Sequence, residues 1–139
     1  GAALRVPLGR AVGVDLWSQT DQQANSAAAA RANALAEGVA ERVAVQDGDM
    51  RQLPFPDASF DAVVSSLAIH NLPSRDDRRR AIQENVRVLR PGGRVALLDI
   101  AHAGQYAEDL RAAGLTDARA GGWSPWIFPP ARTVTGRKP

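Results

Sequence analysis

Residues 48–72, GDMRQLPFPDASFDAVVSSLAIHNL, place an acidic turn, a proline-containing loop and an apolar run in direct succession. Pro54 and Pro56 exclude regular structure from the loop, because proline lacks a backbone N–H and fixes φ. The run from Phe60 to Ala68 predicts a strand. The stretch therefore predicts a loop with a functional role, followed by a strand.

The elements upstream of this stretch are two strands and a helix. The segment Ala11–Leu16 is apolar and rich in Val, which is typical of a strand buried on both faces of a parallel sheet, with Asp15 near its carboxyl end. A helix is predicted over Ser26–Glu37, because its first residue can cap the N-terminus and Gly38 can supply a left-handed stop. A second strand is predicted over Arg42–Gln46.

Downstream, helix and strand signals continue to alternate until about the last twenty-five residues. The spacing of Ser74 and Asp77 predicts a capping-box-like helix start. The predicted elements are a helix from there to about Arg90, a break at Pro91–Gly93, a strand over Arg94–Ile100 and a helix over Tyr106–Ala113 that ends at Gly114. Leu115–Trp123 and Arg132–Arg137 then predict two strands with no helix between them, which is an antiparallel hairpin.

This order of elements predicts an α/β fold, with βα units around a mostly parallel sheet and an antiparallel hairpin at the carboxyl end. In such folds ligands bind at the carboxyl ends of the strands. The length of 139 residues suits one domain, and no repeat, heptad or linker marks a boundary, so residues 1–139 are expected to form a single domain.

Composition excludes several kinds of function. The chain contains no Cys, which excludes disulfides, zinc-thiolate sites and cysteine nucleophiles and favours a cytoplasmic location. The formal net charge is only +2. The basic run Arg75–Arg80 is interrupted by two Asp, and in a helix its arginines would point in several directions around the axis rather than form one basic face. No nucleic-acid partner is therefore expected. The visible chain has no apolar run of the ~20 residues that would cross a bilayer. Because it begins at Gly1 rather than Met, an upstream segment is expected.

Four stretches together resemble class I S-adenosylmethionine-dependent methyltransferases, especially the small-molecule group. They are VGVDL at 12–16, residues 48–72 quoted above, VRVLRPGGRVALLD at 86–99 and LRAAGLTD at 110–117. The resemblance covers most of the chain, and the middle stretch is the most specific of the four. It implies a Rossmann-like, doubly wound sheet of seven strands, the last one inserted antiparallel. It also implies in-line methyl transfer from S-adenosylmethionine to a small-molecule acceptor.

The resemblance assigns the nucleoside half of the cofactor to four residues. Asp15 would accept hydrogen bonds from the ribose hydroxyls, a task that suits an acceptor-only carboxylate, and Leu16 would pack on the adenine. Asp49 would receive the adenine amine, and Met50 would line the base with a polarisable thioether. These residues are the predicted cofactor-binding group around the base and the sugar.

Ser65 and Ser66 stand where the family makes backbone contacts to the methionine part of the cofactor. His70 follows directly, and it is a candidate base for an acceptor hydroxyl or amine because histidine titrates near neutrality. A purely structural histidine is the alternative. No metal is expected, because His70 and His102 are the only histidines and have no carboxylate cluster beside them in the sequence.

The chain departs from the family pattern at its amino end. The family opens with a strand and a GxGxG loop, which lets backbone approach the cofactor; neither is present, and Gly1 is a candidate for the last glycine of that loop. Without that strand, the strands on either side of it would have to find other partners. A second departure is the insert WSQTDQQANS at 17–26, whose Trp17 and amide side chains could border the cofactor site.

Two other functions compete with methyl transfer. A nicotinamide-dependent dehydrogenase also uses an acid at a strand end for the ribose, but the Tyr–Lys pair of such enzymes is absent: Leu110 stands four residues after Tyr106, and the one Lys is Lys138. The second is a truncated, non-catalytic domain that binds cofactor weakly or not at all. Trp123, Trp126 and Phe128 have two interpretations, an apolar lid over a substrate pocket or packing against the sheet.

Overall fold

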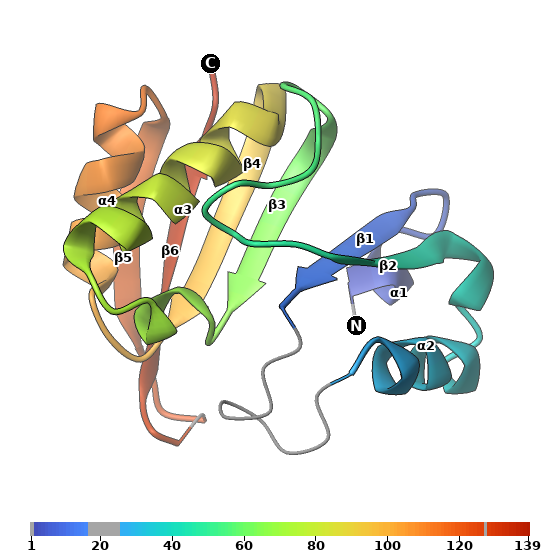
Figure 1. Cartoon of the computed structure of the whole chain (residues 1–139). Helices are drawn as coiled ribbons and strands as arrows, with labels where there is room; N and C mark the ends of the chain where they lie inside the picture. The colour runs from blue at the N-terminus through green and yellow to red at the C-terminus, as the bar shows by residue number, and fades with distance from the viewer. Residues whose placement is uncertain (1, 17–25, 127) are drawn as a thin grey trace. The chain divides into compact units, whose positions relative to one another are not determined.

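The computed structural model describes residues 2–16, 26–126 and 128–139 (Figure 1). The chain divides into two compact units, Gly1–Met50 and Arg51–Pro139. The expectation that residues 1–139 form a single domain stays a prediction. Gly1 and the greater part of the insert, residues 17–25, lie outside the described residues.

The first unit is built around a pair of parallel strands. Its elements are α1 (Ala2–Arg5), β1 (Ala11–Asp15), α2 (Ala27–Ala36), the 3-10 turn η1 (Ala40–Arg42) and β2 (Val43–Asp47). Ala11 lies opposite Val43, and Asp15 lies opposite Asp47. Both strands therefore end in an acidic residue at the same edge of the sheet.

Local signals in the sequence explain the ends of α2. The Ser26 hydroxyl accepts a hydrogen bond from the backbone N–H of Ala29 at 3.0 Å, as expected of an N-cap. Gly38 has φ +68°, a left-handed conformation that costs glycine little. Both predictions for this helix are confirmed. Only small side chains and one Val form the buried cluster of this unit, namely Ala3, Ala34 and Val39.

The second unit is a mixed sheet with two helices. Its elements are β3 (Phe60–Ser66), the 3-10 turn η2 (Ile69–Asn71), α3 (Arg75–Val88), β4 (Leu89–Asp99), α4 (Ala103–Ala112), β5 (Thr116–Ser124) and β6 (Ala131–Arg137). The strand order is β3-β4-β6-β5, with β3 parallel to β4 and β6 antiparallel to both of its neighbours. The α/β fold and the antiparallel hairpin near the carboxyl end are confirmed.

The core of the second unit lies between this sheet and the two helices. α3 and α4 cover the same face of the sheet (Figure 1). The largest side chains that are almost fully inaccessible include Tyr106, Ile82, Leu97 and Leu110. The Ser74 hydroxyl accepts the N–H of Asp77 at 3.0 Å and fixes the start of α3, which confirms the predicted cap.

Two predicted starts are wrong: α4 begins at Ala103 rather than Tyr106, and β4 begins at Leu89 rather than Arg94. The helix before β4 ends at Val88, near the predicted Arg90. The break expected at Pro91–Gly93 is therefore part of β4. The strand tolerates these residues because a register shift against β3 absorbs them, with Gly92 at φ +80°. The Gly92 N–H also donates to the Lys138 carbonyl at 2.9 Å, which keeps this stretch paired.

The strands that hold the two groups of predicted cofactor residues belong to different sheets. β1 pairs with β2, and β3 pairs with β4. Within the described ranges no ladder joins β1 to β3.

Candidate functional site

The first group of predicted residues lies at the carboxyl edge of the β1–β2 sheet. Asp15 is the last residue of β1, and its carbonyl accepts the N–H of Gly48 at 3.2 Å. Asp49 and Met50 follow β2 and are half-buried, whereas Leu16 is 63% exposed. The structure therefore gathers two carboxylates and two apolar side chains at one sheet edge.

The second group begins where β3 ends, at Ser66. Ser65 is half-buried and Ser66 is exposed. The next residue, Leu67, turns the chain with φ +52°, and its N–H donates to the Leu98 carbonyl at 2.8 Å. Ile69 is buried in the core and anchors η2, the turn that contains His70. His70 therefore lies just beyond the end of β3, at the carboxyl edge of the second sheet.

Asp99, the last residue of β4, organises this edge. Its carboxylate accepts the backbone N–H of His70 at 3.0 Å and of Ile100 at 2.9 Å, and the hydroxyl of Tyr106 at 3.2 Å. Its side chain is 3% exposed. Three donors compensate the burial of the charge. Burial, together with the nearby Asp99 charge, raises the pKa of Tyr106 well above its usual value, so this hydroxyl stays a donor.

The His70 ring lies against the same carboxylate. Its Nδ1 is 2.5 Å from Asp99 Oδ1. A ring with its proton on Nδ1, facing the carboxylate, would have its lone pair on Nε2. The His70 side chain is 21% exposed, and an approaching molecule can reach it.

Asp99 and Tyr106 were not among the predicted site residues. A signal for Asp99 was present, because it ends an apolar strand in the same way as Asp15. Tyr106 had no such signal, since it stands in the first turn of an amphipathic helix and is typical there of a core residue.

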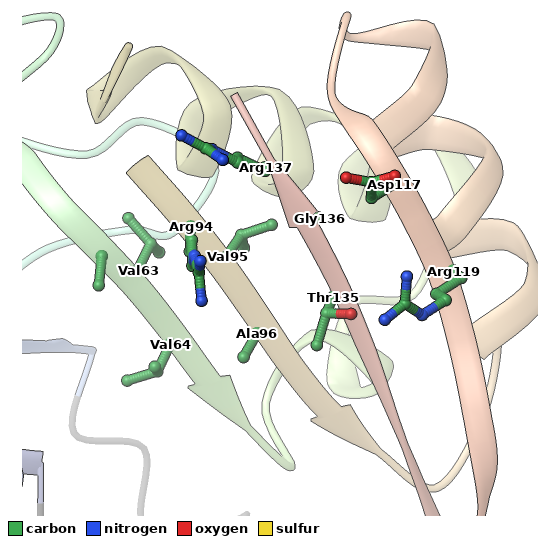
Figure 2. A pocket seen from close by; sticks show the side chains of 11 residues that line it. Val63, Val64, Arg94, Val95, Ala96, Asp117, Arg119, Thr135, Gly136 and Arg137 are labelled. Carbon is green, nitrogen blue, oxygen red and sulfur yellow. The ribbon is translucent and has the colours of Figure 1, made fainter. Parts of the chain in front are cut away.

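A separate hollow of about 430 Å³ lies on the face of the second sheet opposite α3 and α4 (Figure 2). Arg94, Arg119 and Arg137 are among its lining residues, together with Asp117 and small or branched side chains of β3 and β4. It includes none of the predicted cofactor residues. In the second unit, the candidate site is therefore at the carboxyl ends of β3 and β4 and not on this open face of the sheet.

The aromatic side chains at the end of β5 and in the β5–β6 connection do not pack against the sheet. Trp123 is 61% exposed, Trp126 92% and Phe128 96%, so the packing interpretation is wrong. The Arg132 guanidinium lies 5.6 Å from the centre of the Trp123 ring, in a cation–π arrangement. The lid interpretation stays a prediction.

Two kinds of feature are absent from the described part of the chain. No three or more His, Cys, Asp or Glu side chains there gather in a way that could hold a metal ion. None of the helices described has the length and apolar character to span a membrane.

The fold and the acids at its strand ends define an α/β methyltransferase-like protein. The family model described as a methyltransferase domain matches residues 2–97. The chain therefore belongs to the methyltransferase domain family, whose members normally use S-adenosylmethionine.

Two named relatives match shorter parts of the chain. The 27-O-demethylrifamycin SV methyltransferase of Amycolatopsis mediterranei is 48% identical over 61 residues, which are 44% of this chain and 21% of that protein. The ubiquinone/menaquinone biosynthesis C-methyltransferase UbiE of Brucella anthropi is 41% identical over 69 residues, which are 50% of this chain and 25% of that protein. The matches thus span a quarter or less of these two relatives.

Solved structures resemble the chain over nearly its whole length. The [4+2]-cyclase SpnF has a TM-score of 0.72 at 22% identity and covers 99% of this chain and 70% of its own. PigF with SAH has a TM-score of 0.69 at 18% identity, over 99% of this chain and 45% of its own. These likenesses show the fold alone. Since one of the two proteins is a cyclase, the fold by itself does not establish methyl transfer.

Proposed function

We propose that this chain holds the cofactor-binding and acceptor-activating groups of a methyltransferase that uses S-adenosylmethionine and acts on a small molecule. The observation that carries the proposal is the His70–Asp99 pair at the edge where β3 and β4 end. Family membership supports methyl transfer. The demethylrifamycin and quinone-biosynthesis relatives support an acceptor of small size.

The residues at the β1–β2 edge fit the chemistry of the nucleoside. Asp15 and Asp49 are acceptor-only groups, which suit the ribose hydroxyls and the adenine amine. Leu16 offers exposed apolar surface to the base, and Met50 offers a polarisable sulfur. We assign backbone contacts to the methionine part of the cofactor to Ser65 and Ser66. When bound, the cofactor supplies a methyl carbon already activated by a sulfonium, so transfer depends on orientation and needs no covalent nucleophile.

His70 would act as the base for the acceptor. Its Nε2 lone pair would take the proton of an acceptor hydroxyl or amine, which would leave that atom free to react with the methyl carbon that the bound cofactor supplies. The ring then becomes an imidazolium, which the Asp99 carboxylate stabilises. Tyr106 and the backbone donors hold Asp99 in the position where it can do so.

A second candidate function follows from the sequence, which contains no GxGxG loop to let backbone approach the cofactor. A domain of this kind that binds cofactor weakly or not at all would be a non-catalytic module.

The chain has no Cys and a net charge of only +2. On this basis our proposal includes a cytoplasmic location and a small-molecule partner rather than a nucleic acid.

The test is a calorimetric titration of the chain with S-adenosylmethionine and with S-adenosylhomocysteine. Asp15→Asn should weaken binding of both by about 10–100-fold, because a hydrogen bond to a charged group contributes roughly 1.5–3 kcal/mol. Glu41→Gln, an exposed acid in η1, is the matched control and should bind as the unchanged chain does. His70→Ala should also keep its cofactor affinity, yet methylate a phenolic probe about 10²–10⁴-fold more slowly near neutral pH.

The outcomes distinguish the two functions. If the folded chain does not bind, but a chain extended at its amino end by a strand and a glycine-rich loop does, the non-catalytic function holds for this chain. If neither binds, the methyltransferase proposal is wrong. An unchanged rate for His70→Ala would leave His70 a structural residue.

A further inference from the structure

The end of β5 and the connection from β5 to β6 present large aromatic side chains to solvent. Trp126 and Phe128 are almost completely exposed, and Trp123 is mostly exposed. Burying a large apolar side chain is favourable relative to leaving it in water. Three such residues within six positions form an apolar patch, which is typical of a binding surface. We call these three side chains the aromatic tip.

The aromatic tip lies at the same edge of the second sheet as His70. Asp99 is opposite Arg132 in the β4–β6 ladder, and Ser124 is opposite Ala131 in the β5–β6 ladder. The connection therefore leaves the sheet beyond the carboxyl ends of β3 and β4, as Figure 1 shows. Adjacent strands are about 4.8 Å apart, so β5 lies roughly 10 Å from β4, and the tip is within reach of one small molecule held at Asp99.

The side chains of residues 120–131, which include the aromatic tip, favour a neutral ligand. Residues 120–131, AGGWSPWIFPPA, include no charged side chain. The nearest cation, Arg132, is engaged, because its guanidinium lies over Trp123 and its Nε donates to the Gly121 carbonyl at 2.8 Å. An anionic ligand or an acidic lipid surface would find no uncommitted cation in this segment. Aromatic rings bind apolar and aromatic surfaces through offset or edge-to-face contact.

The backbone of the segment is also restricted. Three of its residues are proline, at 125, 129 and 130, and each fixes φ. A restricted loop loses less conformational entropy when a ligand orders it. The tip is therefore suited to binding with little reorganisation.

We infer that the aromatic tip is the specificity-determining element for the methyl acceptor. Trp126 and Phe128 hold the apolar body of the acceptor, Trp123 is the fixed base of the tip, and the reactive hydroxyl or amine lies at His70. The acceptor is then a neutral molecule with an aromatic or other apolar body about 10 Å or more in length. The inference rests on the proposed function for the identity of its ligand as a methyl acceptor.

The test uses binding of biphenyl-4-ol and of phenol to the full chain, measured by calorimetry without cofactor. Biphenyl-4-ol should bind saturably and at least about 10-fold more tightly than phenol, because its second ring can stack on the tip. The double variant Trp126→Ser/Phe128→Ser should lose that preference and keep the unfolding temperature of the unchanged chain, since both side chains are exposed. Leu8→Ser, which removes a fully exposed apolar side chain from the first unit, is the control and should change neither value.

Three results would overturn the inference. One is equal affinity for biphenyl-4-ol in the double variant and the unchanged chain. Another is no preference over phenol in the unchanged chain. The third is sedimentation showing a dimer that the double variant dissolves, with no binding of the probe, which would make a second copy the occupant. Because cofactor is absent from the test, a chain that binds biphenyl-4-ol through the tip but fails to bind S-adenosylmethionine would contradict the proposed function alone.

Discussion

The two units of the chain use the same kind of apolar strand in different surroundings. In the second unit, β4 lies between β3 and β6, and Val95 and Leu97 are 2% and 1% exposed. In the first unit, the ladder of β1 described here is with β2, and Val12 is 38% exposed. A two-stranded sheet is marginally stable in water by itself. A strand sequence suited to burial on both faces therefore does not ensure that burial.

The buried side chains of the first unit are also smaller than those of the second. The buried hydrophobic residues described in the first unit are Ala3, Ala34 and Val39, while those of the second include Tyr106 and Leu110. Hydrophobic stabilisation grows with apolar area removed from water, so alanines contribute little. We therefore expect the second unit to hold most of the stability of the chain. The three predictions that follow test this comparison.

The largest expected effect is that of Leu97→Ala in β4. Removing a fully buried Leu should lower the free energy of unfolding by about 2–5 kcal/mol, because it leaves a cavity. Val12→Ala in β1 is the matched change in the first unit and should cost less than about 1 kcal/mol. Urea unfolding followed by hydrogen exchange measures both effects and locates them. Equal losses would contradict the comparison, since β1 would then be as deeply buried in solution as β4.

The second prediction concerns the loop that begins the second unit, which Arg87 of α3 holds in place. The guanidinium donates to the carbonyls of Phe55 and Leu53 at 2.8 and 3.1 Å, and it pairs with Asp57 at 2.8 Å and Glu84 at 2.7 Å. Glu84 in turn accepts the Leu53 N–H at 2.7 Å. The hydrogen bond from Arg87 is the largest cause of a lowered pKa of Glu84.

Arg87→Ala should therefore lower the free energy of unfolding by about 1–3 kcal/mol, because it removes several hydrogen bonds of a charged group. Amide exchange should accelerate over residues 53–59. Arg79→Ala is the control: its ion pair with Asp76 is exposed on both sides and contributes about 0–1 kcal/mol. Exchange that stays slow over residues 53–59 would mean that the prolines, rather than Arg87, order the loop.

Local interactions account for the parts of the fold that the sequence predicts well. Ser26 and Ser74 cap helices through contacts three residues away, and the left-handed glycines Gly38 and Gly114 lie just after helix ends. Such interactions are visible in a short window of sequence. The alternation of apolar strands and helices likewise predicts the α/β class.

Non-local interactions account for the parts that the sequence does not predict. Pro91–Gly93 has the composition of a break, yet it lies in β4 because pairing across the sheet tolerates a register shift. The His70–Asp99 contact joins residues 29 positions apart, and no local pattern indicates it. The sequence also did not predict that the aromatic tip is exposed, because aromatic residues in a hairpin are found both in buried cores and at binding surfaces.

The smallest expected effect is that of Asp109→Asn in α4. Its carboxyl is 6% exposed, one of its oxygens has no hydrogen-bond partner, and its nearest cation is Arg75 at 3.6 Å. Burial raises the pKa of Asp109 above its usual value, and Arg75 only partly opposes this. A carboxyl whose pKa is raised by folding favours the folded state while it is protonated, below the unfolded pKa. That contribution is lost as the pH rises through the folded pKa.

Asp109→Asn should therefore make the second unit slightly more stable near neutral pH, and its gain over the unchanged chain should shrink as the pH falls towards about 4. Glu108→Gln alters the exposed neighbour in the same helix and should show no such pH-dependent gain. The measurement is the difference in urea midpoint between variant and unchanged chain across this pH range. A variant that is less stable at neutral pH would show that the Arg75 ion pair outweighs the cost of burying the charge. The core of the second unit would then tolerate a buried carboxylate more easily than its apolar packing indicates.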